Sequence, residues 1–397
     1  MGGNLKHGSS QRGGAGLRDG GWSSLKKRFD KCPVFPIMVA MFEHRNHTIH
    51  WILSKVSSLL LSDHFVLFSS LLYFFVLWLF IPKIASSRNL ANLSSNMWPL
   101  LTLVIGQMFV LIVGGIDLSQ TAIMAVTSVL GAMVMSGRLD PMLFEKNPLW
   151  GIILSEKGGL LGGSAWATPV GIIVMLVAGT LIGLINGLSV AKLKMPPFMV
   201  TLVSMFFFSG LAIYLTRSEN IMYLPKSFIA LGKGSAGSFC FALILIVLAW
   251  LILSRMVLGR WLYAVGMNVR AALVSGVPTG KVIVLAYMFS GFCAAVGSIL
   301  YSARLRMGRP TLGENLLLDI IGAAVIGGIS LFGGKGKVVW AVYGVLFFTI
   351  LANSLNRMNL DFYTVNIVKG SVILFAAMLD VTRTRLLSAS RSPKGGN

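Results

Sequence analysis

The amino-acid sequence predicts an all-α, polytopic membrane protein with about ten transmembrane helices and with both termini in the cytoplasm. The first observation is composition: 55% of the 397 residues are hydrophobic, 12% are charged, and the mean hydropathy is +0.79. A water-soluble domain carries about 25% charged residues and could not cover its surface with half that share. The second observation is a series of apolar stretches near the bilayer-spanning length of about 20 residues. The third is the distribution of lysine and arginine between the loops.

Composition also excludes other classes of protein. Three cysteines are too few for the framework of a small secreted scaffold. The net charge of +21 lies in residues 1–64 and in short loops, without zinc-ligand spacing or an aromatic and basic stripe. This distribution indicates topology and contact with anionic membrane lipid, and it does not favour a nucleic-acid partner.

The chain divides by polarity into three parts. Residues 1–62 form a polar, basic cytoplasmic tail, residues 63–382 the transmembrane domain, and residues 383–397 a second cytoplasmic tail. The start lacks the plan of a signal peptide, because no apolar core follows its first basic residues. Residues 49–61 are open to two interpretations, a short interfacial helix or part of a disordered tail.

Ten apolar stretches account for the transmembrane domain. In order they are 63–82, 97–116, 119–136, 167–191, 198–216, 238–257, 282–303, 317–333, 338–356 and 364–381. The second, third, eighth and tenth are short or interrupted, and we expect irregular backbone there to line a cavity. Small residues recur every fourth position at Gly179, Gly183 and Gly187, and again at Gly291 and Ala295. This spacing favours close helix packing.

Lysine and arginine set the orientation. With the N-terminus inside, the cytoplasmic segments hold 21 of the 34 basic residues and the outer loops hold 12. Cytoplasmic loops carry the excess of positive charge in membrane proteins. The count therefore predicts an N-in and C-in arrangement, which requires an even number of helices.

The chemistry of an enzyme is missing from the sequence. The glycine-rich segment Gly333–Lys337 lacks the spacing and hydroxyl of a nucleotide-binding loop. His44, His47 and His50 would fan over more than one helix face, so we expect a solvated tail and no metal site there. Few ionisable groups lie in the apolar stretches, which disfavours a proton relay. Hydroxyl and amide groups in a membrane path suit a neutral polyhydroxy solute.

Two segments carry more specific information. Gly114–Ser119 reads Gly-Gly-Ile-Asp-Leu-Ser, in which the glycines permit a turn at membrane depth and Asp117 and Ser119 can cap the next helix. The loop 255–281 holds four basic residues and no acidic one. Its segment Arg270–Ser275 can form a short amphipathic helix ended by Gly276. Such a helix is a docking element for another subunit.

These segments resemble, in order, motifs of the permease subunits of ribose/xylose-type ABC sugar importers, within the wider branched-chain permease family. Gly114–Ser119 matches the family's G-G-I-D-L-S, and residues 259–277 resemble its cytoplasmic loop. Further likenesses lie at Lys194–Leu202, Leu318–Gly336 and Ile367–Gly370. The likeness spans about 65–385.

The sequence departs from the family pattern at two of these motifs. Gln120, Thr121 and Ala122 stand where Val-Gly-Ser usually follows the first motif, so the substrate preference is expected to differ. In the cytoplasmic loop the family's acidic residue is absent, and Arg270 adds a base nearby. A partner ATPase is therefore expected to carry a compensating acid.

The resemblance implies a non-enzymatic transport subunit in the bacterial inner membrane, with the fold of an ABC importer permease. It implies uptake of a monosaccharide or related polyol of the pentose or hexose class by ATP-driven alternating access. The implied partners are an ABC ATPase that binds ATP and Mg²⁺, a periplasmic sugar-binding protein and a second permease copy in a homodimer. The chain itself is expected to bind no cofactor or metal. A secondary carrier or channel for a small polar solute, without an ATPase, is the alternative.

The candidate path residues follow from the cost of burying polar groups in a membrane without a partner. Hydrogen bonding between helices is the competing interpretation for each path residue. The candidate translocation path comprises Asp117, Ser119, Gln120, Asn186, Asn353, Asn356 and Asn366. The candidate ATPase-docking loop comprises Gly259, Arg260, Arg270, Ala271, Ala272, Ser275 and Gly276. Asp319 and Lys369 are candidates for an ion pair between two helices.

Overall fold

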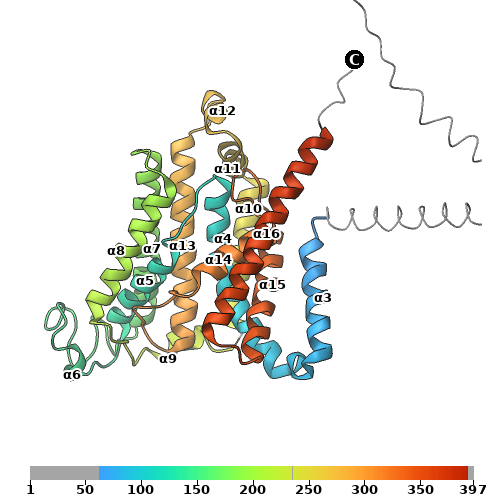
Figure 1. Cartoon of the computed structure of the whole chain (residues 1–397). Helices are drawn as coiled ribbons and strands as arrows, with labels where there is room; N and C mark the ends of the chain where they lie inside the picture. Colours follow the sequence, from blue (N-terminus) through green and yellow to red (C-terminus); the bar gives the residue numbers. More distant parts are fainter. Residues whose placement is uncertain (1–61, 235, 392–397) are drawn as a thin grey trace, which may run out of the picture. The chain divides into compact units, whose positions relative to one another are not determined.

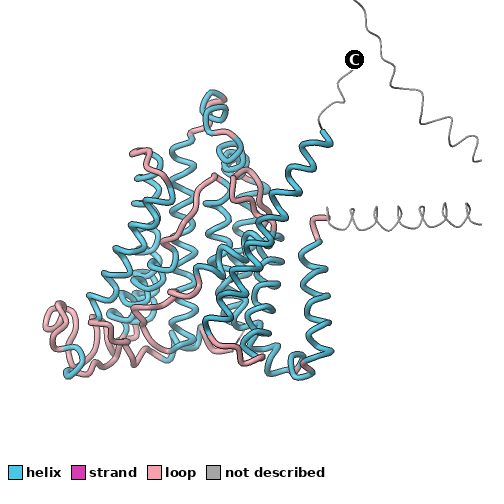
Figure 2. The backbone as a smooth tube through the Cα atoms, in the orientation of Figure 1, coloured by secondary structure: helices cyan, strands magenta, loops and turns pink. Residues whose placement is uncertain are grey.

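The computed structural model of the chain describes residues 62–234 and 236–391, which form helices joined by loops without a named strand (Figures 1 and 2). The chain separates into Met1–Phe65 and Val66–Asn397, and the second unit contains nearly all the described residues. The predicted tail at 1–62 lies outside the described residues except for its last residue, and the 49–61 segment with His44, His47 and His50 lies wholly outside them.

Six of the described helices are long and apolar enough to cross a membrane. They are α4 (Ser87–Ile112), α7 (Ala167–Ala191), α8 (Pro197–Thr216), α10 (Ala236–Arg255), α13 (Thr279–Leu305) and α15 (Val338–Arg357). Shorter apolar helices are α3 (Phe65–Phe80), α5 (Gln120–Met135), α14 (Leu317–Gly327) and the first part of α16 (Phe362–Arg391). The predicted all-α, multi-pass architecture is therefore confirmed.

Short helices occupy the connections between these elements. They are η1 (Pro82–Ala85), α6 (Pro141–Phe144), α9 (Lys226–Leu231), α11 (Val257–Met267) and α12 (Val269–Val274). In Figure 1, α11 and α12 lie at one end of the helix bundle, and α6 and α9 lie at the other.

Two boundaries differ from the predicted stretches. The second stretch was expected to be short or interrupted, but α4 is a continuous helix of 26 residues that begins ten residues earlier. Its first turns are polar, so their low hydropathy excludes them from the predicted apolar stretch. Asn89 in these turns is nevertheless buried against other helices. The third and eighth stretches are short, with 16 and 11 helical residues. The tenth continues as helix α16 to Arg391, past the predicted domain boundary at 382.

A proline inside α4 is compensated by a side chain from α13. Pro99 has no N–H, so the carbonyl of Ser95 loses its partner within the helix. Arg304 Nη1 donates to Ser95 O at 2.9 Å and to Asn96 Oδ1 at 2.6 Å. The cation thus supplies the hydrogen bond that the proline removes, and it ties the end of α13 to α4.

Helices α7 and α13 pack backbone to backbone through the glycines singled out in the sequence. A Cβ atom on Gly179 would lie 2.7 Å from the carbonyl oxygen of Gly291 and 2.8 Å from Cβ of Ala295. A Cβ on Gly183 would overlap the carbonyl oxygen of Tyr287. The predicted close packing of these two faces is confirmed, and the structure shows that they face each other.

Replacement of Gly183 by alanine should destabilise the protein, because the new methyl group meets backbone that no rotamer change can move. Overpacking of this kind costs about 1–3 kcal/mol. Gly210→Ala in α8 is the matched control, since a Cβ there meets nothing within 4 Å. Thermal unfolding of the detergent-solubilised protein should show a lower Tm for Gly183→Ala alone. Equal Tm values for the two variants would contradict this packing.

Candidate functional site

A buried aspartate organises the turn between α4 and α5. Gly114 begins the turn with φ +81, a conformation that glycine adopts at low cost. Asp117 Oδ1 accepts from Ser119 N at 2.9 Å and from Ser119 Oγ at 2.6 Å. Asp117 Oδ2 accepts from Ser290 Oγ of α13 at 2.7 Å. The predicted capping role of Ser119 is wrong in one respect: it is the N-cap residue, but its hydroxyl donates to Asp117 and makes no capping bond.

Two amides extend this arrangement to further helices. Gln120 Nε2 donates to Ser290 Oγ at 2.8 Å, and Asn186 Nδ2 of α7 donates to Ser119 Oγ at 2.9 Å. Together with Asp117 these residues form what we call the buried polar network, which links α5, α7 and α13. All five side chains are buried. Four predicted path residues are therefore brought together: Asp117, Ser119 and Asn186 are bonded directly in series, and Gln120 joins them through Ser290.

The fifth member of the network, Ser290, is absent from the sequence-based candidates. The criterion used for the others, a polar group inside an apolar stretch, applies equally to this serine. Tyr287, one turn earlier on α13, also belongs to the surroundings of the turn, because a Cβ on Gly115 would lie 2.5 Å from its hydroxyl oxygen. The hydroxyl groups of α13 thus carry the same signal in the sequence as the predicted path residues.

The other three candidate path residues lie apart from this network. Asn353 and Asn89 exchange two amide hydrogen bonds of 3.0 and 3.1 Å. Arg357 Nε donates to Asn89 Oδ1 at 2.8 Å. Asn356 is exposed near the end of α15, and Asn366 is partly exposed on α16. The structure therefore does not gather the seven residues along one continuous path.

Asp319 and Lys369 meet between two helices. Lys369 Nζ lies 2.7 Å from Asp319 Oδ1, with only 11% and 12% of the two side chains exposed. The ammonium group also lies 5.7 Å from the ring centroid of Phe348. The pair joins the first turn of α14 to α16, and its opposite charges make burial of both groups tolerable.

The candidate docking loop folds into α11 and α12. The Asn268 side chain accepts from Ala271 N at 3.0 Å at the start of α12, and Gly276 follows the helix with φ +80. The short helix predicted at this place is confirmed. Ala272 is buried, while the neighbouring Leu273 and Val274 are 61% and 90% exposed. An exposed apolar patch at the end of a bundle is typical of a protein-binding surface.

The remaining candidate docking residues divide between packing and exposure. Gly259 is buried, and a Cβ on it would overlap backbone carbonyls at the end of α10. The other members are exposed, apart from the buried Ala272. They are Arg260, Arg270, Ala271, Ser275 and Gly276.

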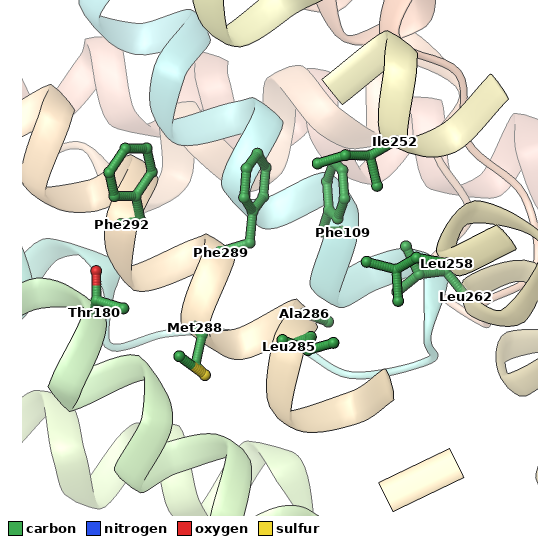
Figure 3. A pocket seen from close by; sticks show the side chains of 10 residues that line it. All are labelled: Phe109, Thr180, Ile252, Leu258, Leu262, Leu285, Ala286, Met288, Phe289 and Phe292. Atoms are coloured by element: carbon green, nitrogen blue, oxygen red, sulfur yellow. The ribbon is translucent and has the colours of Figure 1, made fainter. Parts of the chain in front are cut away.

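An apolar cavity of about 290 Å³ borders α11 (Figure 3). Its lining comes from α4, α7, α10, α11 and α13, and Thr180 is the one lining residue with a polar side chain. Leu258 and Leu262 of α11 lie on one side of it, across from Leu285 and Phe289 of α13. A sugar needs several hydrogen-bonding partners, so this cavity suits apolar groups and is unsuited to a polyhydroxy solute.

Comparison with known proteins places the chain in a family. A family model described as branched-chain amino acid transport system / permease component matches residues 89–379. The ribose import permease protein of Bacillus subtilis is 34% identical over 306 residues, covering 75% of this chain and 86% of the relative. The D-allose transport system permease protein of Escherichia coli is 30% identical over 279 residues, with 69% and 78% covered. No solved structure matches the chain.

A third relative is the galactose/methyl galactoside import permease protein of Escherichia coli. It is 33% identical over 225 residues, which cover 53% of this chain and 67% of the relative.

Removal of the positive charge from the Asp319–Lys369 pair should be strongly destabilising. Lys369→Met leaves a buried carboxylate without its partner, at a cost of about 3–5 kcal/mol. The double variant Lys369→Met with Asp319→Leu removes both charges and should recover most of the stability. Unfolding curves of the purified protein measure both effects. A single variant as stable as the unmodified protein would contradict a stabilising pair.

Proposed function

Because the chain belongs to the family of branched-chain amino acid transport system permease components, we propose that it is the membrane-spanning subunit of an ABC importer. Its substrate is a monosaccharide or a related polyol of the pentose or hexose class. The proposal is supported by relatives whose names specify ribose, D-allose and galactose or methyl galactoside.

The observation that carries the proposal is the docking element α11–α12. It presents exposed apolar residues, among them Leu273 and Val274, beside the cation Arg270. The excess of basic residues in the segments on this side supports a cytoplasmic location for it. There it meets an ATPase subunit that binds ATP and Mg²⁺, since the sequence contains no nucleotide-binding loop of its own.

Transport in this proposal proceeds by alternating access between two permease copies. A periplasmic binding protein delivers the sugar at the end of the bundle where α6 and α9 lie. Closure of the ATPase moves α11–α12, and the helices joined by the buried polar network shift against each other. Asp117, Ser119, Gln120 and Asn186 then exchange their bonds within the buried polar network, which includes Ser290, for bonds to the solute. Hydroxyl and amide groups can make both kinds of bond. The terminal segments 1–62 and 383–397 are cytoplasmic tails.

Reconstituted transport tests the proposed function. Vesicles that contain the chain, its ATPase and its binding protein should accumulate radiolabelled D-ribose, D-allose or D-galactose only when ATP is supplied. The partner subunits are taken from the reading frames that adjoin its gene. Equal accumulation without the ATPase, in the presence of an ion gradient, would favour a secondary carrier and refute the proposal.

Charge reversal at Arg270 should weaken binding of the ATPase and leave binding of the sugar-binding protein at the opposite end of the bundle unchanged. Arg270→Glu places a negative charge where we expect an acidic partner residue, and like charges should weaken binding by about tenfold or more. Co-purification of the ATPase measures this loss, while binding of the sugar-binding protein should be unchanged. Lys233→Glu, an exposed charge reversal in the loop after α9, is the control. Full assembly of the Arg270→Glu complex would contradict docking at α12.

A further inference from the structure

Three glycine-containing segments that lie far apart in the sequence meet at one point. Gly114 follows α4, Gly266 is the penultimate residue of α11, and Gly333 and Gly334 lie in the loop between α14 and α15. A Cβ on Gly266 would overlap the carbonyl oxygen of Ile112 and lie 2.5 Å from Gly334 N. These contacts join backbone to backbone, so no side-chain rotamer can relieve them. We call Ile112, Gly114, Gly266, Gly333 and Gly334 the glycine junction.

The loop between α14 and α15 is the centre of this junction. A Cβ on Gly333 would lie 2.8 Å from Gly266 O and 3.0 Å from Gly114 Cα, so the loop touches both α11 and the turn after α4. Gly333 and Gly334 have φ values of +89 and +72, which glycine adopts readily. Both the space and the conformation at this point therefore require glycine.

Hydrogen bonds hold the same elements together. Gly334 N donates to Ile112 O at 2.9 Å, which satisfies a carbonyl left without an intrahelical partner at the end of α4. Tyr263 Oη of α11 donates to Gly336 O at 2.6 Å. The C-terminal half of α11 is thus fixed to the loop, and the loop is fixed to α4. The apolar cavity lies at the other half of α11, beside Leu258 and Leu262 (Figure 3).

The junction continues directly into the buried polar network. Gly115 packs against Tyr287 of α13, and Asp117, two residues later, accepts from Ser290 of the same helix. Ser119 then accepts from Asn186 of α7. The contacts that lead from α11 to these two transmembrane helices begin with backbone against backbone, at Gly266 and Ile112. Tightly packed interiors of this kind transmit strain because they have little room to absorb it.

We propose that the glycine junction couples the docking element to the membrane helices: movement of α11–α12 reaches the Asp117 turn through Gly266, Ile112 and Gly333. This inference rests on the proposed function, because it takes α11–α12 as the element that an ATPase moves. Gly266 is a positioning residue in this role and touches no substrate. Coupling is measured as transport relative to ATP hydrolysis.

The test compares Gly266→Ala with Gly280→Ala in the full reconstituted complex. Gly280 lies in the same cytoplasmic region, at the start of α13, and a Cβ there meets nothing within 4 Å. Gly266→Ala should raise the ATP hydrolysed per sugar molecule taken up by about 2- to 30-fold, the range found for residues that modulate coupling. The ATPase should still co-purify, and Gly280→Ala should match the unmodified protein.

The outcomes separate the two proposals. If the unmodified complex accumulates none of D-ribose, D-allose and D-galactose with ATP, the proposed function fails. If it does accumulate sugar and Gly266→Ala has an unchanged ratio of ATP to sugar, coupling through the junction is refuted. Should Gly266→Ala prevent assembly, Tyr263→Phe decides, because it removes only the hydrogen bond to Gly336 O. A raised ratio in that variant supports the inference, and an unchanged ratio overturns it.

Discussion

Backbone contact through glycine is the constraint on which this architecture depends. Helices in a bilayer have no hydrophobic effect to drive them together, so close approach of their backbones supplies the packing energy. Glycine provides that approach between α7 and α13. It does so again between α14 and α15, where Gly327 and Gly344 face each other's helix backbone. The same device fixes α11 to the end of α4. The scaffold and the docking element thus share one kind of interface.

Polar side chains complete the constraint, because buried donors and acceptors need partners that the lipid does not supply. Asp117 is bonded through Ser119 and Ser290, and Lys369 is bonded to Asp319. The network around Asp117 binds the helices in this conformation and also holds the groups that suit a polyhydroxy solute. In our proposal the same residues therefore have two roles. They stabilise the helix packing when they bond to one another, and they bind the solute when those hydrogen bonds are replaced by bonds to it.

Local patterns predicted much of the fold and less of the candidate site. The apolar stretches, the glycine faces of α7 and α13, and the short helix α12 are encoded within windows of a few residues. The polar start of α4 was missed because hydropathy does not register Asn89, whose partners lie on α15. The bond between Asp117 and Ser290 spans 173 positions. Tertiary packing decides which polar residues meet and where the glycine segments converge. The spacing of residues in the sequence does not predict these contacts.

The first turns of α4 depend on groups that are synthesised much later. Asn89 bonds to Asn353 and Arg357, and the carbonyl freed by Pro99 bonds to Arg304. When the ribosome has completed α4, none of these partners has yet been synthesised. This polar half-helix therefore reaches its final environment only after α13 and α15 have emerged, late in translation.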